Sequence, residues 1–202
     1  MTRHNNREEI LSAAIQLFSA SGYAGVSMRD IARACHLNVG SLYHHFNDKQ
    51  HLHLAAVQQA FSDRSIILLD ILESSEPPQQ RLTRLIDVFC RLLSEDQTFS
   101  RLIQRELLDA DEVRLKLLAE QVFGRFSNAL NNLCQQLNPE LDPALLATSI
   151  MGMILYPFQS APLRKNLFGF HIEHEQPEII SQHLQKLLCQ GLNQPMSIRG
   201  IA

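Results

Sequence analysis

Residues 27–46, with the sequence SMRDIARACHLNVGSLYHHF, carry the signals of two short helices joined by a tight turn. Ser27 is a favourable N-cap for the first helix, and Asp30 three residues later completes a capping-box pattern. Asn38 caps the second helix, whose apolar residues recur at helical spacing and leave a small polar and aromatic face. This arrangement predicts a helix-turn-helix unit that presents its second helix to a DNA groove.

The segments on either side extend this pattern. An amphipathic helix is predicted over residues 6–20 and ends at Gly22, and Asn47 is predicted to cap a fourth helix. The second short helix ends in Gly-x-Leu-Tyr-x-His-Phe, and the whole segment resembles the TetR family of bacterial transcriptional repressors over about the first quarter of the chain. The matching residues are Arg7, Ile10, Leu11, Ala13, Ala14, Leu17, Phe18, Gly22, Gly40, Leu42, Tyr43, His45, Phe46, Lys49 and Leu52.

The resemblance implies an all-α protein in two parts. An N-terminal three-helix helix-turn-helix DNA-binding head, residues 1–47, is joined to a helical effector-binding and dimerisation body, residues 48–202. The family usually has Gly in the turn where this chain has His36. That position is expected to need a positive φ, which histidine tolerates better than a β-branched residue does. We therefore expect the turn to survive with some strain.

Helices are also predicted along the rest of the chain, and no segment has a convincing strand pattern. The fourth helix continues through Leu68 and is broken by residues 73–78, which include two consecutive prolines. The later helices are predicted to run to about residue 93 and then over 97–109, 111–137, 142–159 and 175–191.

Composition agrees with this interpretation. The net charge is −3, but residues 1–50 hold a mild basic excess, which predicts modest non-specific DNA affinity and specific binding that needs two heads together. The four cysteines lie far apart, which favours buried thiols over disulfides or zinc ligands. The histidine clusters lack helical metal-ligand spacing, so no metal and no cofactor is expected. No apolar run approaches the ~20 residues of a membrane span, and no secretory signal is visible, so we expect a cytoplasmic protein without a membrane partner.

The predicted partner of the head is a double-stranded DNA operator. The first turn of the recognition helix places Gly40 and Ser41 toward base edges, whereas Tyr43 and Lys49 are better placed for phosphates. For Tyr43 the alternative is a packed aromatic ring with a hydrated hydroxyl. The candidate DNA-contacting residues are Ser27, Arg29, Asn38, Val39, Gly40, Ser41, Tyr43, His44 and Lys49.

The body has two further predicted partners. The resemblance implies a homodimer that pairs through the last two long helices, although the same apolar residues would also suit an ordinary core. The candidate interface residues are Leu146, Ile150, Ile154, Phe158, Ile180, Leu184 and Leu187. The resemblance also implies an unidentified small-molecule effector. The candidate pocket residues, which core packing would also explain, are Phe89, Phe99, Ile103, Arg105, Phe123, Phe126, Met151 and Tyr156.

Two interpretations stay open. The adjacent Arg105 and Glu106 are either part of a solvated face with an interhelical salt bridge or a polar anchor for the effector. An enzyme is not expected, because no Gly-x-Ser-x-Gly, phosphate-loop or zinc-hydrolase motif is present. The alternative to a regulator is a helical protein-interaction module whose helix-turn-helix head no longer reads DNA.

Overall fold

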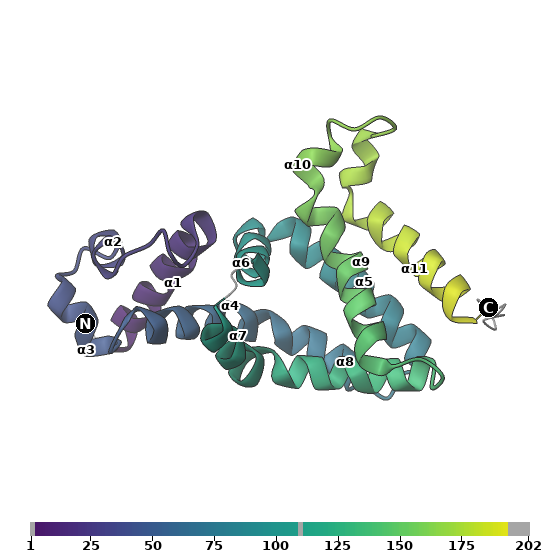
Figure 1. Cartoon of the computed structure of the whole chain (residues 1–202), viewed down its shortest axis with the longest axis horizontal. Coiled ribbons are helices and arrows are strands. Elements are labelled where there is room, and N and C mark those ends of the chain that lie inside the picture. Colours follow the sequence, from purple (N-terminus) through teal and green to yellow (C-terminus); the bar gives the residue numbers. More distant parts are fainter. Residues whose placement is uncertain (1–2, 109–110, 194–202) are drawn as a thin grey trace. The chain divides into compact units, whose positions relative to one another are not determined.

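A computed structural model describes residues 3–108 and 111–193, and all regular structure in those ranges is helical (Figure 1). The α-helices are α1 (Arg3–Ser21), α2 (Met28–Ala34), α3 (Val39–His45), α4 (Lys49–Leu72), α5 (Pro78–Glu95), α6 (Gln97–Leu108), α7 (Glu112–Leu118), α8 (Gly124–Leu137), α9 (Pro143–Gln159), α10 (Ala161–Arg164) and α11 (Pro177–Asn193). None of the described helices is both long enough and apolar enough to cross a membrane.

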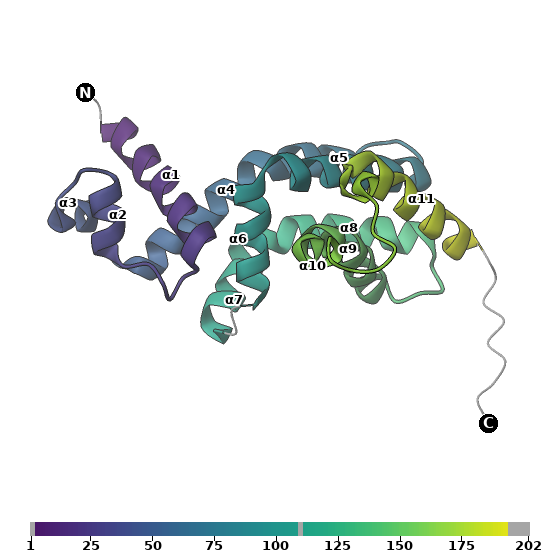
Figure 2. The same ribbon diagram turned by 90° about the horizontal axis from the view of Figure 1, so that it is seen from above.

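The chain divides into two compact units. The first comprises the chain up to Leu69 together with residues 95–128, and the second comprises residues 70–94 together with the chain from residue 129. The boundary predicted after residue 47 therefore falls inside the first unit. The physical reason is that α6 packs against α1, as Figure 2 shows, and that Leu102 of α6 and Leu118 of α7 join the core of the head.

One hydrophobic core holds the first unit together. Each short helix of the head buries one apolar stripe, and α1, α4, α6 and α7 supply the rest of the core. The buried members include Ile10, Leu11, Ala14, Phe18, Met28, Ile31, Ala32, Leu42, Phe46, Leu52, Ala56, Val57, Leu102 and Leu118. Burying these stripes leaves the opposite, polar faces of α2 and α3 toward solvent.

Most of the local signals in the head are confirmed. Ser27 and Asp30 form the reciprocal capping box of α2, and the Asn38 side chain accepts a hydrogen bond from the Ser41 amide. Gly22 follows the end of α1 with φ 70°, and His36 adopts φ 56° in the turn. The strained turn conformation expected for a histidine in a glycine position is therefore present.

The predicted cap of the fourth helix was wrong by one residue. The side chain that accepts a backbone hydrogen bond there is Asp48, whose Oδ1 lies 2.8 Å from the amide nitrogen of His51. Its Oδ2 also lies 2.9 Å from Nδ1 of the same histidine. These hydrogen bonds, the backbone one first, hold the pKa of Asp48 below its ordinary value, although burial opposes the shift.

The helix predicted over residues 111–137 is not continuous in hydrogen bonding. Asp111 caps α7, a π-helical turn over Ala119–Phe123 follows it, and α8 starts at Gly124. A Cβ atom added at Gly124 would lie 3.1 Å from the carbonyl oxygen of Ala119. The glycine thus fits a turn in which a larger residue would force its neighbour to move.

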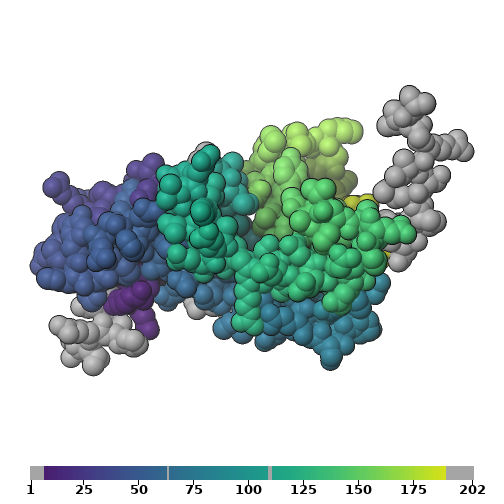
Figure 3. Space-filling model, turned by 60° about the horizontal axis from the view of Figure 1, so that its bottom comes forward, coloured from purple at the N-terminus to yellow at the C-terminus, as the bar shows by residue number. Residues whose placement is uncertain are grey.

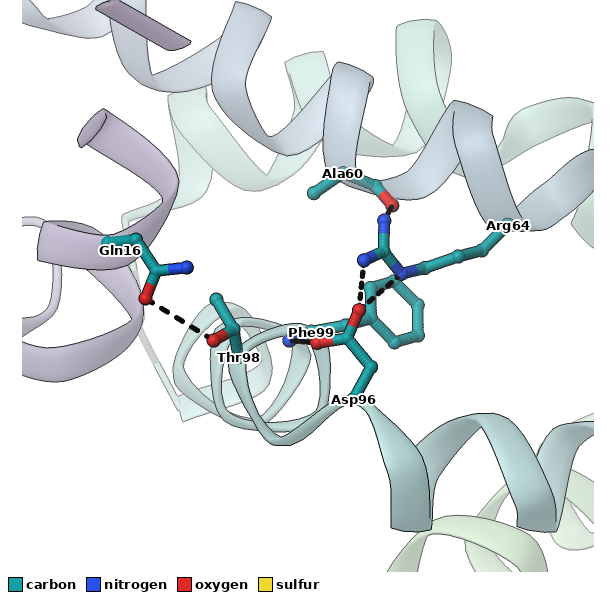
Figure 4. Close-up of polar contacts among 6 residues, drawn as sticks. All are labelled: Gln16, Ala60, Arg64, Asp96, Thr98 and Phe99. Carbon is teal, nitrogen blue, oxygen red and sulfur yellow. Dashed lines mark hydrogen bonds and ion pairs between the residues drawn. The ribbon is translucent and has the colours of Figure 1, made fainter. Parts of the chain in front are cut away.

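Asp96 fastens the start of α6 to α4. Its carboxylate accepts hydrogen bonds from the Phe99 amide, at 2.8 Å, and from the Arg64 guanidinium, which also donates to the Ala60 carbonyl (Figure 4). Burial alone would raise the pKa of Asp96, but the hydrogen bonds from Phe99 and Arg64 outweigh it and lower that pKa. On the other side of α6, Thr98 hydrogen-bonds Gln16 of α1 (Figure 4).

The second unit is built from α5, α8, α9 and α11. Arg81 of α5 is buried and donates to the Leu72 carbonyl at 2.7 Å and to the Gln136 side chain. Gln185 of α11 donates to the Thr83 carbonyl of α5. The core is apolar and contains Leu82, Leu85, Ile86, Phe89, Cys90, Leu93, Leu130, Leu133, Cys134, Ile150, Ile154, Ile180, Leu184 and Leu188.

The residues predicted for a dimer interface do not share one surface. Five of them are buried inside the single chain: they are Leu146, Ile150, Ile154, Ile180 and Leu184. Phe158 is half-buried, whereas Leu187 is 50% exposed. The large exposed apolar residues on α9 and α11 are instead Leu145, Tyr156, Ile179 and Leu187.

We expect the two buried thiols of the second unit to be unreactive in the native protein. Burial, with a smaller contribution from Asp87, raises the pKa of Cys90 to about 12, and burial raises the pKa of Cys134 to about 11. At pH 8 both thiols are protonated and covered. Peptide mass spectrometry after iodoacetamide labelling should therefore find these two cysteines modified at the rate of unfolding, and later than half-buried Cys35. Labelling of Cys90 as fast as that of Cys35 would contradict the prediction.

Candidate nucleic-acid interface and ligand cavity

The helix α3 turns a polar face outward because its apolar face is anchored in the core. Leu42 is fully buried and Phe46 nearly so, and the Arg7 guanidinium lies 5.2 Å from the centre of the Phe46 ring. On the opposite side Tyr43 is 50% exposed and His44 is exposed. The exposed face of α3 can therefore contact a DNA groove while Leu42 and Phe46 stay packed in the core.

The start of α3 is shaped by its cap. The Oδ1 atom of Asn38 accepts a hydrogen bond from the Ser41 amide at 2.7 Å. A Cβ atom added at Gly40 would lie 3.2 Å from the same Oδ1. Glycine at this position therefore keeps the cap uncrowded and leaves exposed backbone at the leading end of the helix.

A shallow, open depression lies beside this end of α3. It is lined by the segment from Ala24 to Asp30 and by Val39, Tyr43 and Lys49. Five candidate DNA-contacting residues thus share one surface: Ser27, Arg29, Val39, Tyr43 and Lys49. The other four candidates, Asn38, Gly40, Ser41 and His44, belong to α3 or its cap.

Two members of this surface are already engaged within the protein. The Ser27 hydroxyl donates to Oδ2 of Asp30 at 2.5 Å and accepts from the Asp30 amide. Hydrogen bonds from the side chain and then the backbone of Ser27 hold the pKa of Asp30 below its ordinary value. Lys49 places its Nζ atom 4.1 Å from the centre of the Tyr23 ring, and burial, with a smaller contribution from Arg114, lowers its pKa. Arg29 is exposed.

Behind the head lies a buried polar cluster that connects α4 to α6 and α7. His53 of α4 has no exposed surface, and its Nε2 lies 2.8 Å from Oε1 of Glu106 on α6. The His53 ring packs nearly perpendicular to the rings of Phe18 and Tyr23. The Arg114 guanidinium of α7 lies over the Tyr23 ring, and its Nε is 3.9 Å from Oε2 of Glu106. No local pattern in the sequence pairs His53 with Glu106, because 53 positions separate them.

Arg105 and Glu106 point to different partners. The Arg105 side chain donates to the carbonyl oxygens of Ser19 at 2.8 Å and Ala20 at 2.5 Å, near the end of α1. It therefore satisfies carbonyls that the helix itself leaves unpaired. Glu106 is buried and contacts His53 of α4 and Arg114 of α7, so it is not on a solvated face, whereas Arg105 caps the end of α1.

A cavity of about 540 Å³ lies between α6 and the segment from α7 to α8. The surfaces of α6 and α7 are drawn in teal in Figure 3. Its lining residues are Ile103, Glu106, Leu107, Leu115, Leu118, Ala119, Phe123, Gly124, Ser127 and Asn128. Of the candidate pocket residues, Ile103 and Phe123 line it. Phe99 and Phe126 pack instead against Phe61 in the core of the first unit.

The remaining candidate pocket residues lie elsewhere. Phe89, Met151 and Tyr156 belong to the second unit, where Phe89 is buried in the core and Tyr156 is exposed. Across residues 3–108 and 111–193, no group of three His, Cys, Asp or Glu side chains is arranged to hold a metal ion.

An exposed helix, capped by Asn38 and braced by two packed helices, defines the first unit as a helix-turn-helix DNA-binding domain with a helical extension. Comparison with known families gives the same class. The family model described as "Bacterial regulatory proteins, tetR family" matches residues 10–56. The model described as "HTH-type transcriptional dual regulator CecR, C-terminal domain" matches residues 78–193, which is more than half of the chain. The chain is a transcriptional regulator of the TetR family, with a body of the CecR C-terminal type.

Individual relatives agree with this assignment. The transcriptional repressor DhaR of Mycobacterium sp. (strain GP1) is 28% identical over 165 residues, covering 77% of this chain and 83% of the relative. The solved structure of FadR from Bacillus subtilis, in complex with stearoyl-CoA, has a TM-score of 0.75 at 17% identity and covers 91% of this chain and 98% of that one. AibR in complex with isovaleryl coenzyme A and operator DNA has a TM-score of 0.70 at 21% identity, covering 90% and 97%. At these identities the two structures establish a shared fold.

Proposed function

We propose that this regulator is a repressor that binds a palindromic operator as a homodimer and is released by a small-molecule effector. The observation that carries the proposal is the surface at the leading end of α3, where Ser27, Arg29, Val39, Tyr43 and Lys49 lie together and exposed backbone lies beside them. A repressor of this kind works in the cytoplasm, where the chromosomal DNA lies.

Roles on DNA follow from position. Ser41 is on the first turn of α3, where a hydroxyl can donate to or accept from a base edge, and Val39 offers an apolar contact for a thymine methyl. Tyr43 and Lys49 lie farther from the leading end and suit phosphate oxygens, as does exposed Arg29. We infer that Tyr43, Lys49 and Arg29 position α3 on the DNA backbone and that Ser41 contributes to the choice of base sequence.

The dimer proposal rests on the outer faces of α9 and α11. Leu145 and Tyr156 of α9 are 69% and 66% exposed, three helical turns apart on one side of the helix. Between them Gly152 has open space where a Cβ atom would be, so another helix could approach closely. Ile179 and Leu187 provide an apolar stripe on α11. Exposed apolar stripes on two contacting helices are typical of a surface that a second copy covers.

The cavity beside α6 supports the effector part of the proposal. It adjoins Glu106, which also contacts His53 of α4, so a bound molecule would lie one side chain away from α4. An effector releases DNA if it binds more tightly to an arrangement of the heads that does not fit the operator. The structures of FadR and AibR were solved with acyl-coenzyme A ligands. We propose that DNA binding by this chain is likewise controlled by a bound small molecule.

We expect three substitutions in the head to separate positioning from specification. Tyr43→Phe removes one hydroxyl hydrogen bond and should weaken binding to every operator by about 1 kcal/mol. Lys49→Ala should weaken binding to all sequences and reduce the salt slope by about one. Ser41→Ala should change the operator preference by about 1–3 kcal/mol per affected base pair. Fluorescence anisotropy with DNA from the gene's own upstream region, across salt concentrations, measures all three.

Lys116→Ala is the matched control, because Lys116 is an exposed lysine of α7 that pairs with Glu120. It should leave operator affinity unchanged. Equal effects of the three head variants on every operator would refute the division of roles. Absence of saturable, salt-sensitive binding by the parent protein would remove the repressor proposal and favour a head that no longer reads DNA.

A further inference from the structure

The last turn of α1 is completed by a side chain of another helix, Arg105 of α6. An α-helix leaves the carbonyl oxygens of its last turn without partners inside the helix. The Phe18 carbonyl accepts a hydrogen bond from the Gly22 amide at 2.8 Å. The next two carbonyls, of Ser19 and Ala20, accept from Nε and Nη2 of Arg105 at 2.8 and 2.5 Å. The guanidinium also places its positive charge at the negative end of the helix dipole.

The backbone that follows α1 leaves room for this guanidinium. Gly22 adopts φ 70°, and a Cβ atom added there would lie 3.2 Å from Nη1 of Arg105. This distance is shorter than an ordinary van der Waals contact, so a larger residue would push the guanidinium away. Glycine therefore provides both the left-handed backbone and the space that the contact between α6 and α1 needs.

Consecutive residues of α6 hold two different helices of the first unit. Arg105 holds the end of α1, whereas Glu106 is hydrogen-bonded to His53 of α4. Glu106 is buried, but Arg105 lies at the surface, so Arg105 can be changed without opening the core. Since α1 packs against α2 and α2 against α3, any rotation of α1 on α6 would carry the recognition helix with it.

We propose that Arg105 is a positioning residue that sets the angle of the head on α6, and thereby the half-site spacing that the dimer reads. The inference rests on the proposed function, because spacing matters only to a homodimer on a palindrome. Each base pair added between two half-sites turns one of them by about 35° around the DNA axis. A planar guanidinium that donates to two carbonyls resists rotation of α1, so the second head meets its half-site in alignment.

Binding of the full chain to a series of DNA duplexes tests the proposal. The duplexes carry the operator from the gene's own upstream region, with its central spacer unchanged or altered by one or two base pairs, and one further duplex carries a single half-site. Fluorescence anisotropy should show that Arg105→Gln loses about tenfold in affinity at the unaltered spacing but less than about twofold on the half-site. Its preference among spacings should be weaker than that of the parent. Arg105→Lys, which keeps the charge without the planar fork, should fall between the two.

Arg101→Gln is the matched control, because it makes the same change at an exposed arginine about one turn earlier on α6. It should keep the parental values, and light scattering should give the same mass for all variants. The quantity compared is the ratio of the palindrome and half-site affinities, because partial unfolding lowers both together. Equal losses of Arg105→Gln on the two kinds of duplex would show a structural role alone and overturn the proposal.

A second substitution reaches the same contact from the side of α1. Gly22→Ala should weaken the spacing preference of the parent, because the added Cβ displaces the guanidinium. The same change should have little further effect on the spacing preference of Arg105→Gln, although the strain of alanine at positive φ is present in both backgrounds. If Arg105→Gln does not fold, Gly22→Ala and Arg105→Lys test the proposal, and an unchanged spacing preference in both would overturn it.

The parent protein separates failure of this inference from failure of the proposed function. If the parent binds the palindrome no more tightly than the half-site, the homodimeric repressor is refuted and the spacing role with it. If the parent prefers one spacing and Arg105→Gln keeps that preference, the positioning role of Arg105 fails while the repressor function stands.

Discussion

Charged residues on the outer faces of α9 and α11 should convert the protein to a monomer and lower its operator affinity by about a hundredfold or more. The variant is Leu145→Glu with Leu187→Glu, which changes two exposed apolar side chains and leaves the core untouched. In a dimer that covers this surface, two buried and unpaired carboxylates per subunit would have to be desolvated. In a dimer, binding of the first head holds the second head close to its half-site, so the second head binds as if the step were intramolecular. A monomer would lose this advantage.

Light scattering coupled to size-exclusion chromatography measures the mass, and anisotropy measures operator binding. The matched control is Leu163→Glu with Leu167→Glu, which changes two similarly exposed leucines outside α9 and α11. The control should remain a dimer with parental affinity. A dimer that survives the first pair of substitutions would place the interface elsewhere.

The head could be predicted from sequence because its signals are local. The capping box of Ser27 and Asp30, the cap at Asn38 and the turn at His36 each involve residues within a few positions of one another. Because each of these contacts spans only a few positions, the neighbouring sequence contains the residues that make it. The error at Asn47 has the same origin: Asp48 beside it is an equally good cap, and local preference does not separate the two.

Surfaces and long-range pairs could not be predicted in this way. Leu145 and Leu146 are chemically identical and adjacent, yet one is 69% exposed and the other 8%. A turn of about 100° between neighbouring positions on a helix decides which of them enters the core. The nearly all-apolar sequence of α9 hides that choice. The partnership of Glu106 with His53 depends on how α6 packs against the head, which no local pattern encodes.

Loss of the Glu106 carboxylate should destabilise the first unit by about 3 kcal/mol or more, because removing one partner leaves the others buried without it. Glu106→Leu would deprive both His53 and Arg114 of the carboxylate that lies between them. His53→Leu should cost less, since Glu106 would keep Arg114 as a neighbour. Urea unfolding at one fixed protein concentration measures these differences, because dissociation of a dimer would otherwise shift the midpoint.

The double variant, His53→Leu with Glu106→Leu, decides whether the contact between His53 and Glu106 is itself stabilising. If the two leucines pack against each other, the double variant should be more stable than the sum of the single losses implies, by about 0.5–3 kcal/mol. Glu120→Leu on the exposed side of the same unit should stay within about 0.5 kcal/mol of the parent. Strict additivity would mean that the hydrogen bond between His53 and Glu106 does not couple α4 to α6, and that His53 acts through its packing against Phe18 of α1 and Tyr23. In that case a ligand at Glu106 would have no route to the head through this histidine.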